Sequence, residues 1–155
     1  MDVRVERRKL AGRVHERLRE VAVLLDDGDR GAVREIGLTP AHVILLRLLE
    51  PDAADAAGRT ITNLAERMLC TRGNATRLVQ RLVEAGLVVT RADPADQRLV
   101  RVHLTAEGAE RLAAARRRQA DLDDRRFAEL TDGQLRQLRD LLDRVADLLT
   151  AHNGA

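Results

Sequence analysis

The stretch TRGNATRLVQRLVEAGLVVTRADPADQRLVRVHLT, residues 71–105, carries the pattern that decides the fold. Thr71 can cap a helix that ends at Ala85, because a glycine follows as a C-terminal stop. In residues 87–91 and 99–104 the pattern becomes extended, with apolar and polar residues alternating in the second run, and an Asp-Pro turn lies between them. The stretch therefore predicts one helix followed by a two-stranded wing.

A shorter helix is expected just before this one. Thr62 can cap a helix that runs through Leu69, and Cys70 and Thr71 then join the two helices as a helix-turn-helix. In the second helix, one face is apolar and consists of Ala75, Leu78, Val79, Leu82 and Val83. The opposite face presents long hydrogen-bond donors, as a helix that contacts a polar partner would.

The residues before this motif predict two more helices. Apolar residues recur at helical spacing within 3–26, and the polar run 26–31 is expected to be a loop. Thr39 reads as an N-cap before Pro40, and this second helix is expected to be buried until Pro51 stops it. Residues 51–59 are expected to form a surface connection.

Two helices are expected after the wing. Thr105 can cap a long fifth helix with a weak apolar stripe consisting of Ala109, Leu112, Ala113 and Phe127. Thr131 and Gln134 form a capping box for a sixth helix, whose apolar residues follow a 3-4-3-4 spacing. With the first helix, this stripe is predicted to bury a subunit interface that includes Leu10, Val14, Leu138, Leu142, Val145 and Leu149.

The predicted fold is mainly α-helical with a small β-wing. A winged helix-turn-helix lobe occupies about 38–104, and dimerisation helices from both termini occupy about 3–26 and 105–150 of a single domain, 1–155. The composition supports one domain, since 45% of the 155 residues are apolar. The single cysteine excludes an intramolecular disulfide, and charges interrupt every apolar run before the roughly 18 residues that a bilayer span requires. We expect a cytoplasmic protein that does not enter a membrane.

Positive charge is concentrated in the stretch quoted above. The formal net charge of the chain is only +2, but residues 71–104 hold six arginines and three acids, a net charge of +3. Phe127 is the only aromatic residue, which argues against the base stacking by which proteins usually bind single strands. The charge distribution favours double-stranded nucleic acid as the partner.

The stretch 71–105 resembles the recognition helix and wing of the multiple-antibiotic-resistance regulator (MarR) family. The residues that fit the recognition-helix pattern are Thr76, Arg77, Leu78, Arg81, Leu82, Gly86, Leu87 and Val88. Those that fall on the wing signature are Asp93, Pro94, Asp96, Arg98, Val102, Leu104, Thr105 and Gly108. The helix order and the dimerising helices at the termini agree as well, so the resemblance extends over the chain.

The resemblance implies a bacterial homodimeric transcription regulator that binds double-stranded DNA. Most members of the family are repressors that release DNA when a small-molecule effector binds, and no other cofactor is implied. The chain departs from the family at two places. Gly73 stands where many members have proline in the first turn of the recognition helix, and the connection 51–59 is longer than usual.

The recognition helix is expected to read base edges in the major groove, because its N-terminal residues are free to enter that groove. Gly73 would let the backbone approach a phosphate. The predicted contacts on this helix are Arg72, Gly73, Asn74, Thr76, Arg77, Gln80 and Arg81. The alternative, a solvated polar face without a partner, is disfavoured by the adjoining wing.

The wing offers a second reading element. Arg98 follows Asp96 by two residues across a tight turn, so the carboxylate can orient the guanidinium for the narrow minor groove. The alternative is a surface salt bridge that closes a hairpin, worth at most about 1 kcal/mol. Arg91 and Arg101 are predicted to contact phosphates, which positions the protein without reading sequence.

For the cysteine and the histidines, the sequence gives less evidence of a functional role. Cys70 lies in the turn between two helices, where packing is favoured over a redox role. The histidines show no metal-ligand spacing, and we expect no metal site. His15 and His42 could meet in the family's ligand cavity, between the dimer helices and the DNA-binding lobe, although most such histidines are simply packed or exposed.

Two other classes of function were compared with DNA binding. An enzyme is disfavoured, because the sequence has no phosphate-binding glycine loop, nucleophile elbow or metal-ligand spacing. A winged-helix protein-interaction module without DNA binding is the stronger alternative, since one fold serves several functions. The arginines of residues 72–81 together with Arg98 favour DNA, because a protein-binding wing would not need both.

Overall fold

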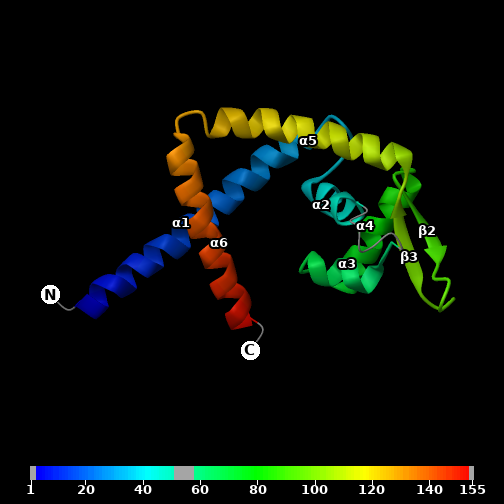
Figure 1. Cartoon of the computed structure of the whole chain (residues 1–155), viewed down its shortest axis with the longest axis horizontal. Helices are drawn as coiled ribbons and strands as arrows, with labels where there is room; N and C mark the ends of the chain where they lie inside the picture. Colours follow the sequence, from blue (N-terminus) through cyan, green and yellow to red (C-terminus); the bar gives the residue numbers. More distant parts are fainter. Residues whose placement is uncertain (1–2, 51–57, 154–155) are drawn as a thin grey trace. The chain divides into compact units, whose positions relative to one another are not determined.

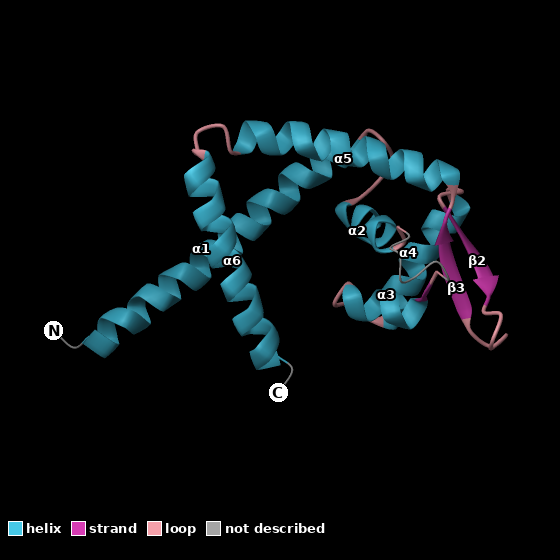
Figure 2. Cartoon of the chain, in the orientation of Figure 1, coloured by secondary structure: helices cyan, strands magenta, loops and turns pink. Residues whose placement is uncertain are grey.

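The computed structural model describes residues 3–50 and 58–153. They form helices with one small antiparallel sheet, which confirms the predicted fold class (Figure 2). The chain divides into two compact units, Met1–Gln119 and Ala120–Ala155. The first unit contains the helix-turn-helix and the wing, and the second contains the last helix.

The first helix, α1 (Val3–Arg34), is longer than predicted. The expected loop at 26–31 is wrong, because these residues continue the helix. The Asp26 carboxylate pairs with the Arg30 guanidinium one turn later, and Val33 is buried in the core, which holds the last turns in place. The helix gives way to a turn that contains Gly37, whose φ of 71° suits glycine.

The second helix, α2 (Pro40–Leu48), begins as predicted. Thr39 is the N-cap, with its hydroxyl accepting from the backbone N–H of His42 at 3.3 Å. The His42 ring returns the bond by accepting from the backbone N–H of Thr39 through Nδ1, also at 3.3 Å. Leu45 and Leu46 are fully buried, whereas Ile44 is exposed, so burial does not extend around the whole helix. Most of the predicted connection 51–59 lies outside the described residues.

The helix-turn-helix consists of α3 (Ile61–Arg67) and α4 (Arg72–Glu84). The predicted cap of α3 is wrong: Thr60, rather than Thr62, accepts from the backbone N–H of Asn63 at 3.2 Å. The predicted cap and stop of α4 are both confirmed. Thr71 accepts from the backbone N–H of Asn74 at 3.2 Å, and Gly86 follows the helix with a φ of 72°.

The wing is formed by β2 (Val88–Ala92) and β3 (Val100–Leu104), which pair antiparallel with Thr90 opposite Val102. A third strand of two residues, β1 (Arg59–Thr60), pairs with the other edge of β3. The strand order is β1-β3-β2, so the prediction of a two-stranded sheet lacked one edge strand. Figure 1 shows the strands beside α3 and α4, with the β2–β3 hairpin projecting from them.

The core draws on most elements of the lobe. Fully buried side chains come from α2, α3, α4, β2, β3 and α5 (Ala106–Arg126), and examples are Leu45, Leu64, Leu82, Val102 and Leu112. These side chains fix α4 and the wing on one rigid support, which is what a binding surface assembled from both elements requires.

The start of α5 is packed tightly against the start of β2. Thr105 caps the helix as predicted, accepting from the backbone N–H of Gly108 at 2.9 Å and donating to the carbonyl of Gly86 at 2.8 Å. A Cβ atom at Gly108 would overlap the carbonyl oxygen of Leu87, so glycine is required there. The predicted stripe of α5 is wrong at Ala109 and Ala113, which are exposed. The buried residues are Gly108, Leu112 and Ala115.

The second unit contains the end of α5 and the last helix, α6 (Asp132–Asn153). The predicted capping box is confirmed, because Gln134 accepts from the backbone N–H of Thr131 at 2.9 Å and donates its own N–H to the Thr131 hydroxyl at 3.3 Å. The apolar stripe of α6 is largely exposed, with Leu142 at 44% and Leu149 at 57%. In the part of the chain that the structure describes, no helix is long and apolar enough to cross a membrane.

Candidate nucleic-acid interface

The two faces of α4 separate as the sequence predicts, except that Val83, expected on the apolar face, is 41% exposed. Ala75, Val79 and Leu82 are buried against the core. The seven predicted contacts of this helix lie on the opposite side. We call these residues the recognition face: Arg72, Gly73, Asn74, Thr76, Arg77, Gln80 and Arg81. Of these only Thr76 is partly buried. The structure therefore brings all seven predicted residues of the helix onto one accessible surface.

The arginines of this surface are not neutralised by the protein. Within residues 3–50 and 58–153, no hydrogen bond or ion pair engages the guanidinium groups of Arg72, Arg77, Arg81, Arg91 or Arg98. In contrast, Arg111, Arg116 and Arg118 of α5 pair with Glu107, Glu50 and Glu35. The free guanidinium groups of α4 and the wing are thus available to an external anion.

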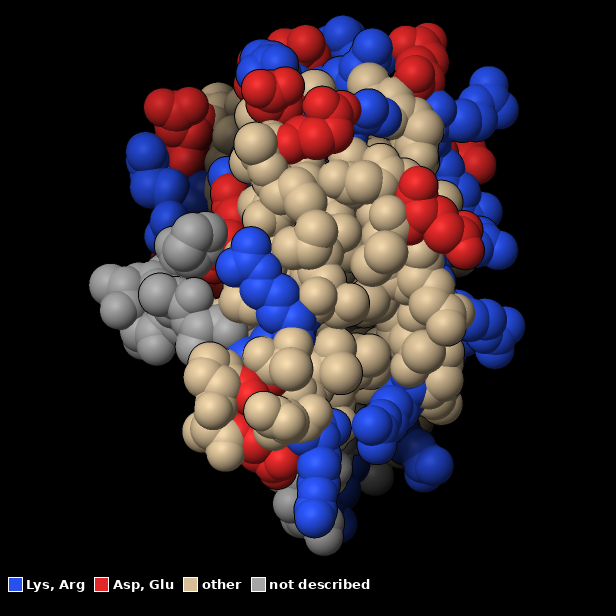
Figure 3. Space-filling model, turned by 90° about the vertical axis from the view of Figure 1, so that its right-hand side faces the viewer, with Lys and Arg blue, Asp and Glu red and all other residues tan. Residues whose placement is uncertain are grey.

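Charge on the wing side of the molecule is unevenly distributed. Figure 3 faces this side and shows a largely uncharged centre, with Lys and Arg gathered along one edge and toward the lower end. The β2–β3 turn lies at the lower end of the lobe in Figure 1. A basic surface beside a neutral one is suited to a polyanion that follows a defined track.

The start of α4 is open. Gly73 lies in the first turn, and a Cβ atom built there would meet nothing within 4 Å. Packing therefore does not require glycine at this position, and the predicted approach of the backbone to a phosphate stays a prediction. Thr76 turns its hydroxyl inward, donating to the carbonyl of Arg72 at 2.8 Å.

The turn before α4 holds a residue that sequence reasoning missed. Leu69 has a φ of 51° and is 95% exposed, although leucine rarely adopts this left-handed conformation and usually packs. Periodicity gives no signal for such a residue, because Leu69 continues the apolar pattern of α3 and was expected inside that helix, which instead ends at Arg67. Cys70 beside it is half-buried, and its backbone N–H donates to the carbonyl of Ala65 at 3.0 Å. This environment is consistent with packing, as predicted for Cys70.

The wing is held by an aspartate that the sequence did not single out for this role. Asp93 is buried, and its carboxylate pairs with the Arg101 guanidinium while accepting from the backbone N–H groups of Ala95 at 2.7 Å and Asp96 at 3.0 Å. Arg101 also donates through Nη1 to the carbonyl of Gly58 at 2.8 Å. The hydrogen bond from Arg101 holds the pKa of Asp93 below its usual value, with help from the two backbone donors.

This geometry corrects two expectations for the wing. Asp96 does not orient the Arg98 guanidinium, because its carboxylate accepts instead from the backbone N–H of Arg98 at 3.0 Å. Two guanidinium nitrogens of Arg101 already donate hydrogen bonds within the protein, to Asp93 and to the carbonyl of Gly58. This side chain therefore stabilises the hairpin and is not available to a phosphate. Arg98 remains exposed at the turn, and its entry into a minor groove stays a prediction.

Within the chain, the two candidate ligand histidines do not meet. His15 is exposed on α1, and the buried end of that helix at Val33 is roughly 27 Å further along its axis. His42 is buried, with Nδ1 in the cap of α2 and Nε2 without a hydrogen-bond partner. Burial lowers the pKa of His42, and the nearby charge of Arg81 lowers it further.

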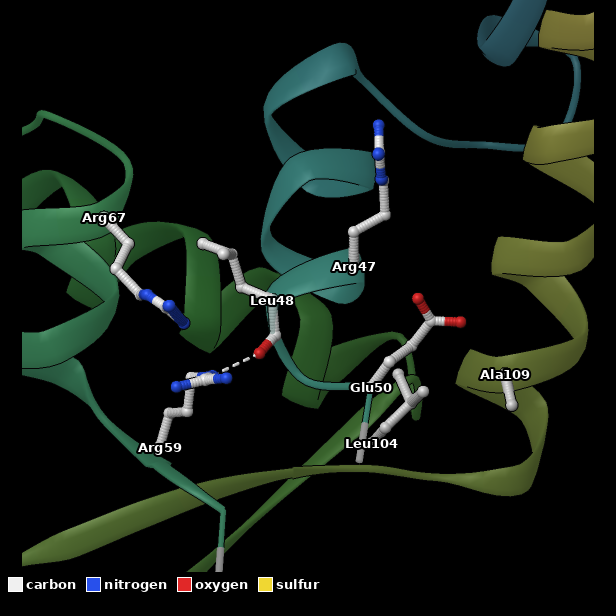
Figure 4. A pocket seen from close by; sticks show the side chains of 7 residues that line it. All are labelled: Arg47, Leu48, Glu50, Arg59, Arg67, Leu104 and Ala109. Carbon is white, nitrogen blue, oxygen red and sulfur yellow. Dashed lines mark hydrogen bonds between the residues drawn. The ribbon is translucent and has the colours of Figure 1, made fainter. Parts of the chain in front are cut away.

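A pocket of about 560 Å³ lies between α2, β1, α3 and α5 (Figure 4). Arg47, Arg59 and Arg67 line it, together with Leu48, Glu50, Leu104 and Ala109. Figure 4 shows the Arg59 side chain turned toward the end of α2, where its Nε donates to the carbonyl of Leu48. The sequence did not predict this pocket, because its lining residues come from five separate parts of the chain. Among the described residues, no three His, Cys, Asp or Glu side chains are grouped so that they could hold a metal ion.

Comparison with known proteins was made on the sequence and on the fold. A family model described as the MarR family matches residues 36–99, from the α1–α2 turn to the end of the wing turn. The uncharacterized HTH-type transcriptional regulator YsmB of Bacillus subtilis (strain 168) is 30% identical over 95 residues, which are 61% of this chain and 62% of YsmB. The chain thus spans about three fifths of the length of this curated relative.

Solved structures extend the similarity over most of the chain. Wild-type MarR from E. coli in its apo form is 27% identical, with a TM-score of 0.72 over 86% of this chain and 95% of that one. A transcriptional repressor described as CouR, bound to a 23-mer DNA duplex, is 26% identical, with a TM-score of 0.79 over 89% of this chain and 95% of that one. The sequence match, the curated relative and the shared winged helix-turn-helix fold agree that the chain is similar to regulators of the MarR family.

Proposed function

We propose that this protein is a transcription regulator that binds double-stranded DNA as a homodimer and acts as a ligand-responsive repressor. The observation that carries the proposal is the recognition face of α4, with its unpaired Arg72, Arg77 and Arg81, on the same rigid lobe as a wing with a free Arg98. The related repressor CouR, solved on a DNA duplex, supports it.

The two elements suit different parts of a duplex. A helix fits the major groove, where Arg77 can bind guanine O6 and N7 with two parallel hydrogen bonds. Arg98, at the exposed turn of the hairpin, has the charge and reach for the electronegative minor groove beside it. Arg91, exposed on β2, is placed to contact phosphate, and Asp93 with Arg101 keeps the hairpin in the shape that presents these arginines.

A homodimer is supported by the apolar side chains that α1 and α6 leave exposed. Leu10 and Val14 of α1 are 56% and 48% exposed, and Leu138, Leu142 and Leu149 of α6 form a continuous stripe. Surfaces of this kind are normally covered by a partner. A two-fold dimer would place two recognition helices on one face of the duplex, and each would read one half of a pseudo-palindrome.

A small-molecule effector is the third part of the proposal. CouR from Rhodococcus jostii RHA1, which is 27% identical, has been solved with p-coumaroyl-CoA bound, and this supports a small molecule as the signal that releases this chain from DNA. Effector binding would have to favour a dimer conformation whose recognition helices no longer match the half-site spacing.

The experiment selects bound sequences from a random duplex pool and measures affinity by fluorescence anisotropy over a salt series. We expect a pseudo-palindrome whose half-sites lie about one helical turn, roughly 10 bp, apart. Arg77→Ala should lose about 1–3 kcal/mol at one base position and relax the preference there. Arg136→Ala, which removes an exposed arginine from α6, is the matched control and should bind normally.

The competing function is a winged-helix module that binds another protein. That alternative predicts no enriched sequence, binding to heparin and DNA that vanishes at moderate salt, and no difference between Arg77→Ala and Arg136→Ala. An asymmetric single half-site with one bound subunit would retain DNA binding but contradict the homodimer.

A further inference from the structure

We propose that Thr76 and Gly73 form an apolar notch on α4 that receives the C5 methyl group of a thymine in the operator, an inference that rests on the proposed DNA-binding function. Both residues lie on the recognition face, three positions apart, and are therefore neighbours on the helix surface. The notch is flanked by the exposed residues Arg72, Arg77 and Gln80.

The orientation of the Thr76 hydroxyl is the first observation. Its hydrogen is donated to the carbonyl of Arg72 at 2.8 Å, one turn back along the helix. A threonine hydroxyl has one hydrogen to give, so this group cannot also donate to guanine or thymine oxygens without breaking that bond. Because the oxygen points back to the helix backbone, the methyl group on the same Cβ is the branch left to meet a ligand.

The space beside that methyl is the second observation. Side chains of a helix lean toward its N-terminus, so the Thr76 side chain covers the surface next to Gly73. Gly73 has no side chain, and a Cβ atom there would meet nothing within 4 Å. The surface is therefore open at that point, beside the Thr76 side chain, and a methyl group of a ligand can approach the helix backbone there.

The chemistry of base recognition selects thymine. In the major groove, thymine alone carries a methyl group, and proteins recognise it by apolar contact, often with a threonine methyl. The flanking arginines prefer guanine acceptors, and Gln80 can bind adenine. These neighbours therefore do not recognise the methyl group of thymine, which needs an apolar contact. The Thr76 hydroxyl could still accept a hydrogen bond from adenine N6 or cytosine N4, and the experiment separates this reading from ours.

The test replaces thymine with deoxyuridine, which keeps the base pair and its hydrogen-bonding groups but lacks the methyl. Full-length protein is titrated by fluorescence anisotropy with the selected duplex and with the same duplex after single thymine-to-deoxyuridine changes. We expect one position in each half-site at which affinity falls about fourfold, the value of one buried methyl group of about 0.8 kcal/mol.

Two variants of Thr76 identify the residue that causes this loss. Thr76→Val keeps the methyl group and should still prefer thymine at that position. Thr76→Ser keeps the hydroxyl but loses the methyl, and should bind the thymine and deoxyuridine duplexes equally. Gly73→Ala fills the notch, so it should weaken binding to the thymine duplex while thermal melts show a folded protein.

The results that overturn the inference are distinct from those that overturn the function. Equal binding of all deoxyuridine duplexes by the parent protein would show that no thymine methyl is read. A parent protein that does not distinguish thymine from deoxyuridine, but prefers adenine or cytosine at one position and loses that preference in Thr76→Val and not in Thr76→Ser, would assign recognition to the hydroxyl. Failure of the parent protein to bind any duplex would refute the proposed function, and this inference with it.

Discussion

His42 combines burial with a hydrogen bond that only its neutral form can make. Its Nδ1 accepts the backbone N–H of Thr39 in the cap of α2, so the proton of the neutral ring lies on Nε2, which is buried without a partner. A protonated ring would carry a hydrogen on both nitrogens and could not accept this bond. The cap, the burial and the nearby Arg81 charge all favour the neutral form.

His42 is therefore expected to make the protein less stable in mild acid. Its pKa in the folded state lies below the usual value of about 6.5, so the unfolded chain binds more protons in this range. The stability contributed by the neutral ring is complete above about pH 6.5 and is lost as the pH falls through the lowered pKa. The melting temperature of the parent protein should fall between pH 7 and pH 5.

Glutamine is the informative replacement, because its amide oxygen can accept the same backbone hydrogen bond but does not titrate. We expect the melting temperature of His42→Gln to fall less than that of the parent between pH 7 and pH 5. Burial also lowers the pKa of His103, so His103→Gln is needed as the matched comparison. Identical pH profiles for His42→Gln and the parent would contradict this role of His42.

At the scale of single elements, the wing separates a structural arginine from a candidate reading arginine. Arg101 is bonded to Asp93 and to the carbonyl of Gly58, whereas Arg98 is exposed and unpaired in the described structure. We expect Asp93→Asn to lower the melting temperature and to weaken binding to every duplex, because the whole hairpin loses its brace. Arg98→Ala should leave the melting temperature unchanged and reduce the salt slope of DNA binding by about 1.

Thermal melts and anisotropy over a salt series distinguish these outcomes. Asp96→Ala is the comparison variant, because its carboxylate holds the backbone N–H of Arg98 without touching the guanidinium. It should weaken binding less than Arg98→Ala and leave the salt slope unchanged, since no positive charge is removed. If Arg98→Ala bound every duplex as tightly as the parent, the wing would be a structural hairpin only.

Elements whose signals are local could be predicted from the sequence. The caps at Thr39, Thr71 and Thr131 each depend on residues within three positions, and all three were placed correctly. The end of α1 could not be predicted, because the polar run 26–31 is helical only when Val33 is buried by the rest of the lobe. The strand β1 has two residues, and its signal is the pairing with β3 more than 40 positions away.

The features of the candidate site also divide into those with a local signal in the sequence and those that depend on distant residues. The recognition face of α4 follows from helical periodicity alone, and the structure exposes it as predicted. The brace between Asp93 and Arg101 joins residues on either side of a turn and adds a contact with Gly58, so no local pattern could show it. The sequence instead suggested the nearer pair, Asp96 and Arg98, because adjacent opposite charges are visible without knowing the register of the strands.

At the scale of the whole molecule, the apolar stripe of α6 calls for a partner. In the described part of α6, no residue is buried within the chain, although Leu138, Leu142 and Leu149 recur at the spacing of a packed helix. Helix α1 also exposes apolar residues, among them Leu10 and Val14, that a partner would cover. A second copy of the chain is the simplest partner under the proposed function, because one lobe can contact only one half-site.

A charge in the stripe of α6 should therefore separate the subunits. Val145→Arg or Leu142→Arg would bury an unpaired charge at the proposed interface, which costs about 3–5 kcal/mol and favours monomers at low micromolar concentration. Ala151→Arg adds the same charge on the opposite side of α6 and should remain dimeric. Light scattering gives the mass, and anisotropy on one half-site and on the full operator gives the consequence. We expect the monomeric variants to keep weak binding to the half-site and to lose the added affinity of the full operator, because the second recognition helix is no longer attached. If Val145→Arg and Leu142→Arg both remained dimeric and bound the full operator like Ala151→Arg, the subunit interface would have to lie elsewhere.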